Sequence, residues 1–372
     1  MPDHPIYGAL TFDTQTVMSN SFDFDGGLLA QLGQFKGTQF QILVTNVVAS
    51  EIAKHLREKI KNTRDELRRS HKDAKLYGLE IAPDPVAQSD TFDARELARK
   101  RLADYLVRIG ATVISTDDVP VRRLLQLYFA AQPPFASGKK KNEFPDAISL
   151  IALEDWAKAN STKILAISGD ADWTAFGAQS TYIDVQADLA KALASLQENA
   201  ERSKAGAIEL LTRISENKLQ HLMAGLMERL SDEVSEARMF AEADSHFNVE
   251  PDQLDLTLLD LDLSNISSLI VVQDNAEQLS VEQMVTLSVD ASADFSFSVH
   301  DDGEDIPMGS ASITKPIDLE AKVLISFEGN RDDDQNLEVT KVELIDYPAD
   351  VHFGYIEPNF EEYDPEDFAP EA

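Results

Sequence analysis

Two aspartates follow short apolar segments that are typical of buried strands. Asp13 comes directly after residues 6–12, and Asp170 comes three positions after residues 163–167. Apolar strands alternate with helical patterns in this part of the chain, which predicts right-handed crossovers and a mainly parallel sheet. Ligands bind beyond the carboxyl ends of the strands in such sheets. Both carboxylates are therefore expected at a ligand-binding edge, where they could hold a divalent cation.

A third aspartate begins a helix behind a cationic loop. Pro145 suits the first helical position, and Asp146 then lies in the first turn, where the helix dipole favours a carboxylate. Lys139, Lys140 and Lys141 come shortly before it. An acidic group here could hold a metal while the lysines bind phosphate. A first-turn aspartate with no further role is the plainer interpretation of this segment alone.

The fourth acidic residue, Glu51, lies in the second turn of a long helix expected from residue 45 or 46 to about residue 77. Nine basic residues follow it on that helix, with four acidic residues interleaved. This pattern suits a solvated face of mixed charge, and it equally suits an arm that contacts phosphates. For the second interpretation, the side chains expected to contact nucleic acid are Arg57, Lys61, Arg64 and Arg68, together with the three lysines of the loop.

Composition limits the class of protein. The chain has 372 residues and no cysteine, which excludes disulfides, thiolate metal sites and cysteine nucleophiles. No apolar run approaches membrane-spanning length, and no signal pattern is visible at the N-terminus, so a soluble cytoplasmic protein is expected. The net charge of −33 is uneven. Residues 201–372 hold 40 acidic and 10 basic residues, whereas residues 1–200 hold 26 and 23.

These patterns predict four parts. Residues 1–190 should form an α/β domain with a parallel sheet between helical layers. Residues 191–250 are helical and charged, and they are expected to connect it to the next part. Residues 251–354 alternate between apolar and polar positions, which predicts an acidic, antiparallel β-domain. Residues 355–372 form an acidic tail.

Together, the four acidic positions resemble those of the PIN-domain nucleases. The resemblance covers roughly residues 5–190. It rests on residues 12–14 (Phe-Asp-Thr), 47–52 (Val-Val-Ala-Ser-Glu-Ile), 144–148 (Phe-Pro-Asp-Ala-Ile) and 167–173 (Ile-Ser-Gly-Asp-Ala-Asp-Trp). The last motif is the most specific, and the match around Glu51 is the loosest. The second half of the chain resembles no family that we can name.

The resemblance implies a metal-dependent endonuclease, with Asp13, Glu51, Asp146 and Asp170 as catalytic residues. Oxygen ligands suit Mg²⁺ or Mn²⁺, and two such ions can activate water and stabilise a leaving oxygen. Asp13 and Asp146 would hold the main ion. Asp170 would share it or hold a second one, and Glu51 would bind directly or through water. Asp172 is a further candidate ligand, and Thr14 or Ser168 could orient a water.

RNA is favoured over DNA as the substrate, in a toxin-like, defence or RNA-processing role. A structure-specific DNA nuclease would use the same site, and a catalytically silent binding module is the non-enzyme alternative. A phosphotransferase with Asp13 as nucleophile would normally have a second aspartate where this chain has Gln15. The acidic C-terminal half would bind a basic protein partner or restrain the first half. A homo-oligomer also stays open, and no membrane association is expected.

Overall fold

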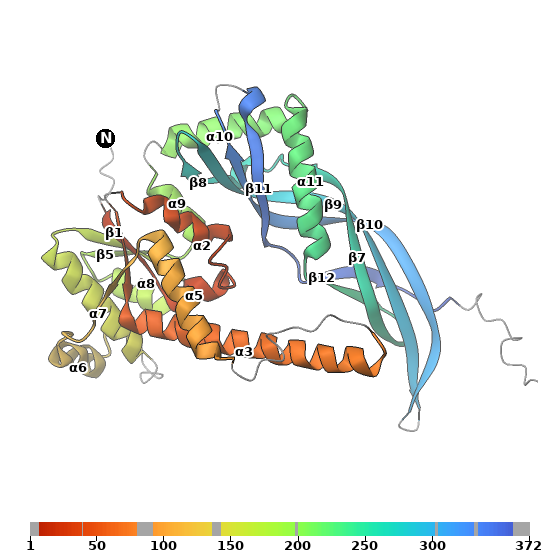
Figure 1. The fold of residues 1–372 in the computed structure, drawn as a ribbon, viewed down its shortest axis with the longest axis horizontal. Coiled ribbons are helices and arrows are strands. Elements are labelled where there is room, and N and C mark those ends of the chain that lie inside the picture. Colours follow the sequence, from red (N-terminus) through yellow and green to blue (C-terminus); the bar gives the residue numbers. More distant parts are fainter. Residues whose placement is uncertain are drawn as a thin grey trace, which may run out of the picture. The chain divides into compact units, whose positions relative to one another are not determined.

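The computed structural model describes residues 7–38, 40–79, 92–135, 143–197, 200–301, 304–330 and 334–359. The chain divides into two compact units, Met1–Leu196 and Gln197–Ala372 (Figure 1). The three loop lysines, Lys139, Lys140 and Lys141, lie outside the described residues, as does most of the acidic tail. No helix in the described part of the chain is long and apolar enough to span a membrane.

The first unit is built on a five-stranded sheet in which every neighbouring pair is parallel. Its strands are β1 (Tyr7–Phe12), β2 (Gln41–Thr45), β3 (Thr112–Ile114), β4 (Lys163–Ile167) and β5 (Ile183–Gln186). Their spatial order is β3-β2-β1-β4-β5, so the chain winds in opposite directions on the two sides of the central pair, β1 and β4. Beyond the carboxyl ends of β1 and β4, where the strand order reverses, is the usual position of a ligand in such sheets.

Helices flank the sheet, which confirms the predicted three-layer α/β fold (Figure 1). They are α1 (Thr14–Ser19), α2 (Gly27–Gln31), α3 (Asn46–Leu76), α5 (Ala94–Ile109), α6 (Val121–Ala130), α7 (Phe144–Ala159), α8 (Ala171–Gly177) and α9 (Leu189–Ser195). Several begin at side-chain caps. The hydroxyl of Thr45, for example, accepts a hydrogen bond of 3.1 Å from the backbone N–H of Val48 and so fixes the start of α3 directly after β2.

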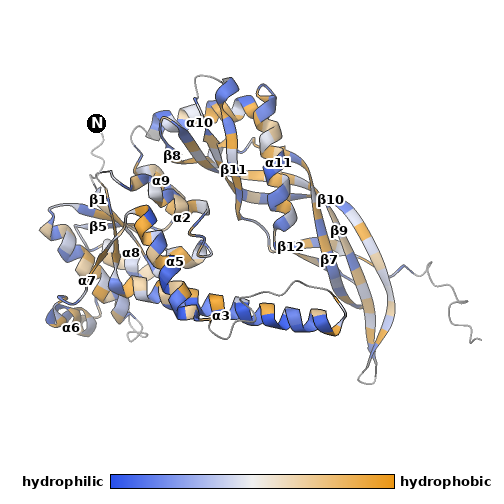
Figure 2. Cartoon of the chain, viewed as in Figure 1, coloured by the Kyte–Doolittle hydropathy of each residue, from blue (hydrophilic) through white to orange (hydrophobic). Residues whose placement is uncertain are grey.

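Helix α3 is buried only near its start. Val48, Ile52 and Leu56 lie in the core of the unit at helical spacing. Beyond them the helix runs on past α5, and Figure 2 shows that this second half is largely hydrophilic. Packing therefore fixes the first turns of α3, which include Glu51, and leaves most of its basic residues in contact with solvent.

A buried ion-pair cluster joins α6 to α7, the helix that carries Asp146. The Glu154 side chain is 9% exposed and accepts hydrogen bonds from Arg123 of α6, from Lys158 at 2.8 Å and from Ser180 at 2.6 Å. Burial opposes ionisation of this carboxyl. The hydrogen bonds from Lys158, Ser180 and Arg123 outweigh burial, and the pKa of Glu154 is lowered.

The second unit is dominated by a long antiparallel hairpin, β9 (Gln278–Asp301) and β10 (Glu304–Glu328). Strands β7 (Asn248–Asp262) and β11 (Glu338–Asp346) extend the sheet on its two sides, and β8 (Ile270–Asp274) also pairs with β9. Strands β6 (Phe240–Asp244) and β12 (Asp350–Tyr355) form a separate parallel pair. The antiparallel β-sheet predicted for the C-terminal half is therefore confirmed.

Helices α10 (Ala200–Ser215) and α11 (Gln220–Glu236) share one apolar core with this sheet. Leu211 of α10 and Leu222 and Leu226 of α11 are buried in that core. Alternate β9 residues, such as Leu287 and Phe295, are buried in it too. The helices thus supply the cover that the apolar face of a single sheet requires.

We predict that Glu154→Gln destabilises the first unit at neutral pH. A lowered pKa means that ionised Glu154 stabilises the fold above its ordinary pKa and loses this contribution as the pH falls through the folded-state value. The loss of charge-assisted hydrogen bonds should cost about 1–3 kcal/mol, a fall in melting temperature of roughly 2–10 °C for a domain of this size. Thermal melts at pH 7 and pH 4 test this, and the difference should shrink at the lower pH.

Asp155→Asn is the matched control, since the Asp155 side chain is 45% exposed and an exposed pair contributes about 0–1 kcal/mol. Equal effects of the two substitutions would contradict the role given to Glu154.

Candidate active site

Asp13 is fixed at the carboxyl end of β1, beside the end of β4. Its backbone N–H donates to the carbonyl of Ile167 at 3.1 Å, which extends the β1–β4 pairing by one residue. One carboxylate oxygen accepts from the N–H and the hydroxyl of Thr16, both at 2.7 Å, and the other accepts from Ser168. Burial raises the pKa of Asp13; these hydrogen bonds oppose the rise, and the nearby Asp170 adds to it. Asp13 is therefore a buried carboxylate held rigidly from both sides.

Asp146 lies in the first turn of α7, as predicted, and Pro145 precedes it there. Its Oδ1 accepts a hydrogen bond of 2.8 Å from Nε1 of Trp173, a fully buried side chain of α8. Among the described residues, no hydrogen bond reaches its second oxygen, Oδ2. The indole thus orients the carboxylate and leaves one of its oxygens available.

The other acidic residues take their positions from neighbouring hydrogen bonds. Glu51 accepts from the hydroxyl of Thr14 at 3.1 Å, which joins α3 to the first residue of α1. Asp170 caps α8 by accepting from the N–H of Asp172 at 2.6 Å. Asp13 caps α1 in the same way. The capping role of an aspartate and a ligand role are compatible here, because a cap uses one side of the carboxylate.

The electrostatics of Asp146 indicate that these residues act on one another. Burial raises the pKa of Asp146 to about 6, opposed by the Trp173 hydrogen bond and reinforced by the charges of Glu51, Asp170 and Asp13. All three other predicted catalytic residues are therefore close enough to repel its charge. A cluster of like charges of this kind is typical of sites that hold a cation or move a proton.

The donor set consists of oxygen atoms alone, which suits Mg²⁺ or Mn²⁺. In the described part of the chain, no three His, Asp or Glu side chains are arranged to hold one ion together. Mg²⁺ commonly keeps several waters and takes only one or two carboxylates. Oδ2 of Asp146 and Oδ2 of Asp170 accept no hydrogen bond among the described residues, so each could supply such a ligand. The residues present thus fit an ion held partly through water.

The basic residues predicted to bind nucleic acid differ in their surroundings. Lys61 and Arg68 are exposed on the second half of α3. Arg64 is half-buried, and its guanidinium stacks at 4.5 Å over the ring of Phe92. Arg57 is also half-buried and borders a pocket on α3. The helix therefore offers both solvated cations and cations already used in packing.

Three side chains at the site were not singled out from the sequence. Trp173 and Thr16 hold the carboxylates of Asp146 and Asp13. Glu143 is buried before α7, and its charge contributes, after burial and Asp170, to a raised pKa of Asp172. Glu143 could have been found from the sequence, because it directly precedes the motif of residues 144–148 that contains Asp146. The contact between Trp173 and Asp146 has no comparable signal, because it joins two helices.

We predict that Asp146→Asn stabilises the metal-free protein at pH 8. With a folded pKa near 6 against an ordinary value of 3.8, the protonated carboxyl is favoured by folding, and this stabilisation is lost as the pH rises through about 6. Asparagine keeps the acceptor for Trp173 and removes the charge. Melting in chelator should therefore occur a few degrees higher for the variant at pH 8, and the difference should fade towards pH 4.

Asp104→Asn, on the exposed side of α5, is the matched control and should leave the pH dependence unchanged. Mn²⁺ should raise the melting temperature of the wild type and not that of Asp146→Asn, because an ion that binds only the folded state stabilises it. A variant that melts in parallel with wild type at every pH, and responds equally to Mn²⁺, would leave Asp146 as a helix-start residue.

The comparisons with known proteins agree with this site. Residues 10–173 match a family model described as PIN domain, and no family model matches the C-terminal half. The match includes all of the predicted acidic residues, from Asp13 to Asp172. Searches of curated proteins and of solved structures found no match to the chain. The first unit of this protein therefore matches the PIN domain family over residues 10–173.

Proposed function

We propose that the protein is a divalent-metal-dependent endonuclease that hydrolyses phosphodiester bonds, with RNA as its substrate. PIN domains are generally nucleases, which supports the broad activity. The observation that carries the proposal is the charge of Glu51, Asp170 and Asp13 acting on Asp146 at the crossover of the sheet. Four carboxylates gathered at a ligand-binding edge suit phosphoryl chemistry with hard cations.

Each residue would have a distinct task. Asp13, fixed by Thr16 and Ser168, would offer a rigid ligand, and Asp146, oriented by Trp173, would offer a ligand with one open oxygen. Two bound Mg²⁺ or Mn²⁺ ions would supply an activated water and stabilise the leaving oxygen.

The remaining acidic residues would support this pair. Asp170 would share the main ion or bind the second, and Glu51 would act directly or through water. Asp172 would serve in the outer shell, because a hydrogen bond from its backbone N–H already fixes the neighbouring Asp170.

The phosphotransferase alternative is less well supported by the surroundings of Asp13. Asp13 is 4% exposed and both of its oxygens accept hydrogen bonds, which hinders its attack on a phosphoryl group. A metal ion would need only the remaining lone pair of Oδ2, which among the described residues accepts from Ser168 alone. A DNA nuclease and a catalytically silent binding module would share the geometry described above, so cleavage assays must separate them. The toxin-like, defence and RNA-processing roles, the cytoplasmic location and homo-oligomerisation stay predictions.

We predict metal-dependent cleavage of RNA that is lost in Asp146→Asn. Labelled RNA and DNA of matched sequence should be incubated with the full-length protein, with Mn²⁺ or with chelator. Removal of one charged group that acts in the transition state commonly costs about 10²–10³-fold in rate, and we expect at least that loss. Asp104→Asn should cleave like wild type. Cleavage of DNA alone would favour the DNA nuclease, and metal-dependent binding without cleavage would favour the silent module.

We also predict that the acidic second unit weakens nucleic-acid binding. The net charge of −30 beyond residue 200 should repel phosphates over a distance limited by salt screening, about 10 Å at 0.1 M. A fragment ending at Leu196, the boundary of the first unit, should bind RNA more tightly than the full chain at low salt. The difference should vanish near 0.5 M salt. Equal affinity at low salt would leave the acidic unit with another purpose, such as binding a basic protein.

A further inference from the structure

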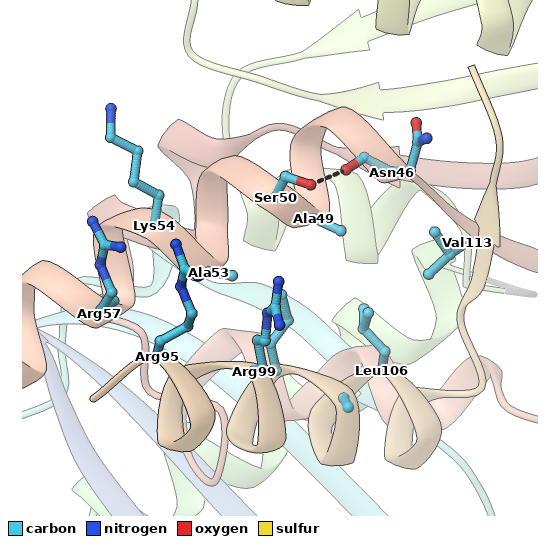
Figure 3. Close-up of a pocket in the computed structure, with 12 residues that line it drawn as sticks. Asn46, Ala49, Ser50, Ala53, Lys54, Arg57, Arg95, Arg99, Leu106 and Val113 are labelled. Carbon is cyan, nitrogen blue, oxygen red and sulfur yellow. Dashed lines mark hydrogen bonds between the residues drawn. The ribbon is translucent and has the colours of Figure 1, made fainter. Parts of the chain in front are cut away.

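A pocket of about 570 Å³ lies between α3 and α5, and none of the predicted acidic site residues lines it (Figure 3). Apolar side chains line part of it, among them Ala53, Leu102, Leu106 and Val113. Four basic side chains project beside it, two from each helix: Lys54 and Arg57 from α3, and Arg95 and Arg99 from α5. Its size lies within the range of pockets that hold small ligands, about 300–1,000 Å³.

The charges in this pocket are unbalanced. Among the described residues that line it, none is an aspartate or a glutamate. Among the described residues, no ion pair is found for Lys54, Arg57, Arg95 or Arg99. Elsewhere on α5, Arg101 and Arg108 both pair with Asp25, so other arginines of the same helix do have acidic partners. Four cations without counter-charges favour an anionic ligand.

Arg57 provides a second, independent observation. Its Nε is buried and has no hydrogen-bond partner within the described part of the chain. A buried donor without an acceptor costs about 1–3 kcal/mol, and native proteins rarely leave one. The guanidinium can present its donors in parallel, as bidentate binding of a phosphate requires. Since Nε itself is enclosed, an anion in this pocket would contact the terminal nitrogens of the Arg57 guanidinium.

The pocket and the acidic site share helix α3 but are lined by different residues of it. Asn46, which lines the pocket, is the first residue of α3 and follows β2 directly, so the pocket reaches the edge of the sheet that carries the carboxylates. Ser50, Ala53 and Arg57 lie on one face of α3 at intervals of three and four residues. Glu51 is turned about 100° round the helix from Ser50. Groups in the pocket would therefore affect binding and leave the reacting atoms untouched.

We propose that this pocket binds phosphate groups of the nucleic-acid strand, at nucleotides away from the bond that is cleaved. The proposal rests on the nuclease function proposed above. None of the described lining residues is aromatic, so they offer no platform on which unpaired bases stack. Its cations and apolar wall would contact the phosphates and sugars, and binding here should not depend on base sequence.

The test compares two double variants of equal charge in the full-length protein. Arg57→Gln with Arg99→Gln removes one pocket cation from each helix. Lys59→Gln with Lys100→Gln removes one exposed cation from each of the same helices, outside the pocket. Affinity for a labelled single-stranded RNA of about 20 nucleotides is measured in chelator, over a range of salt concentrations. Melting curves establish that both variants fold.

We expect the pocket variant to lose about 10-fold in affinity at low salt, with a shallower salt dependence, by about 1–2 in the slope of log K against log salt. The surface variant should lose less than about 2-fold. Arg57→Lys with Arg99→Lys should keep the salt slope while losing part of the affinity, because a lysine keeps the charge and lacks the planar fork. Equal losses in the pocket and surface variants, or no loss in either, would overturn the proposal.

A free nucleotide is the other source of the same phosphate chemistry. If AMP raises the melting temperature of wild type and not of the pocket variant, while RNA affinity is equal in both, the pocket serves a nucleotide and the strand assignment is wrong. Binding in chelator is independent of cleavage. A protein that never cleaves RNA but shows the expected losses would therefore refute the nuclease function and leave the phosphate site standing.

Discussion

The strand order of the sheet brings together two carboxylates that repel each other, Asp13 after β1 and Asp170 after β4. Because the strand order reverses between these two strands, the chain leaves both of them at the ligand-binding edge of the sheet. Two unit charges about 4 Å apart at a surface repel by about 4 kcal/mol. Burial is the main cause of the raised pKa values of Asp13 and Asp146, and repulsion from neighbouring carboxylates adds to it. Hydrogen bonds from Thr16 and Ser168 to Asp13, and from Trp173 to Asp146, hold two of these carboxylates in position.

Much of the first unit could be predicted from local signals. Asp13 and Asp170 lie beyond the ends of strands, and Asp146 lies at the start of a helix, as predicted. These positions could be predicted because strand ends and helix starts depend on a few neighbouring residues. The buried face of α7 was harder to predict. Helical spacing puts Ile148, Ile151, Ala152 and Trp156 on one expected apolar face. Of these only Ile151 is fully buried, whereas Leu150 and Leu153, outside that face, are fully buried too. Helix α7 is covered on several sides, so a single stripe does not describe it.

In β9 and in the α3–α5 pocket, the structure depends on contacts between residues far apart in sequence, which the sequence pattern does not reveal. Residues 285–289 and residues 295–299 each alternate between apolar and polar positions, which by itself suggests two separate strands. In the structure both belong to one strand of 24 residues. Ala291 and Ala293 are buried between them, so the alternation is continuous once small residues are counted as apolar. The α3–α5 pocket depends in the same way on two helices that meet only in the folded chain. Arg95 and Arg99 are spaced to share one face of α5, but the sequence does not say which helix they face.

The central pairing of β1 with β4 has a consequence for the order in which the protein folds. Ser168 and Asp13, which are hydrogen-bonded to each other, are 155 residues apart in sequence. Contacts of this separation form slowly, because the intervening chain loses its freedom before the contact stabilises anything. A ribosome that synthesises the chain must release nearly the whole first unit before β1 can pair with β4. Asp13 and Asp170 therefore come together only after most of the first unit has been synthesised.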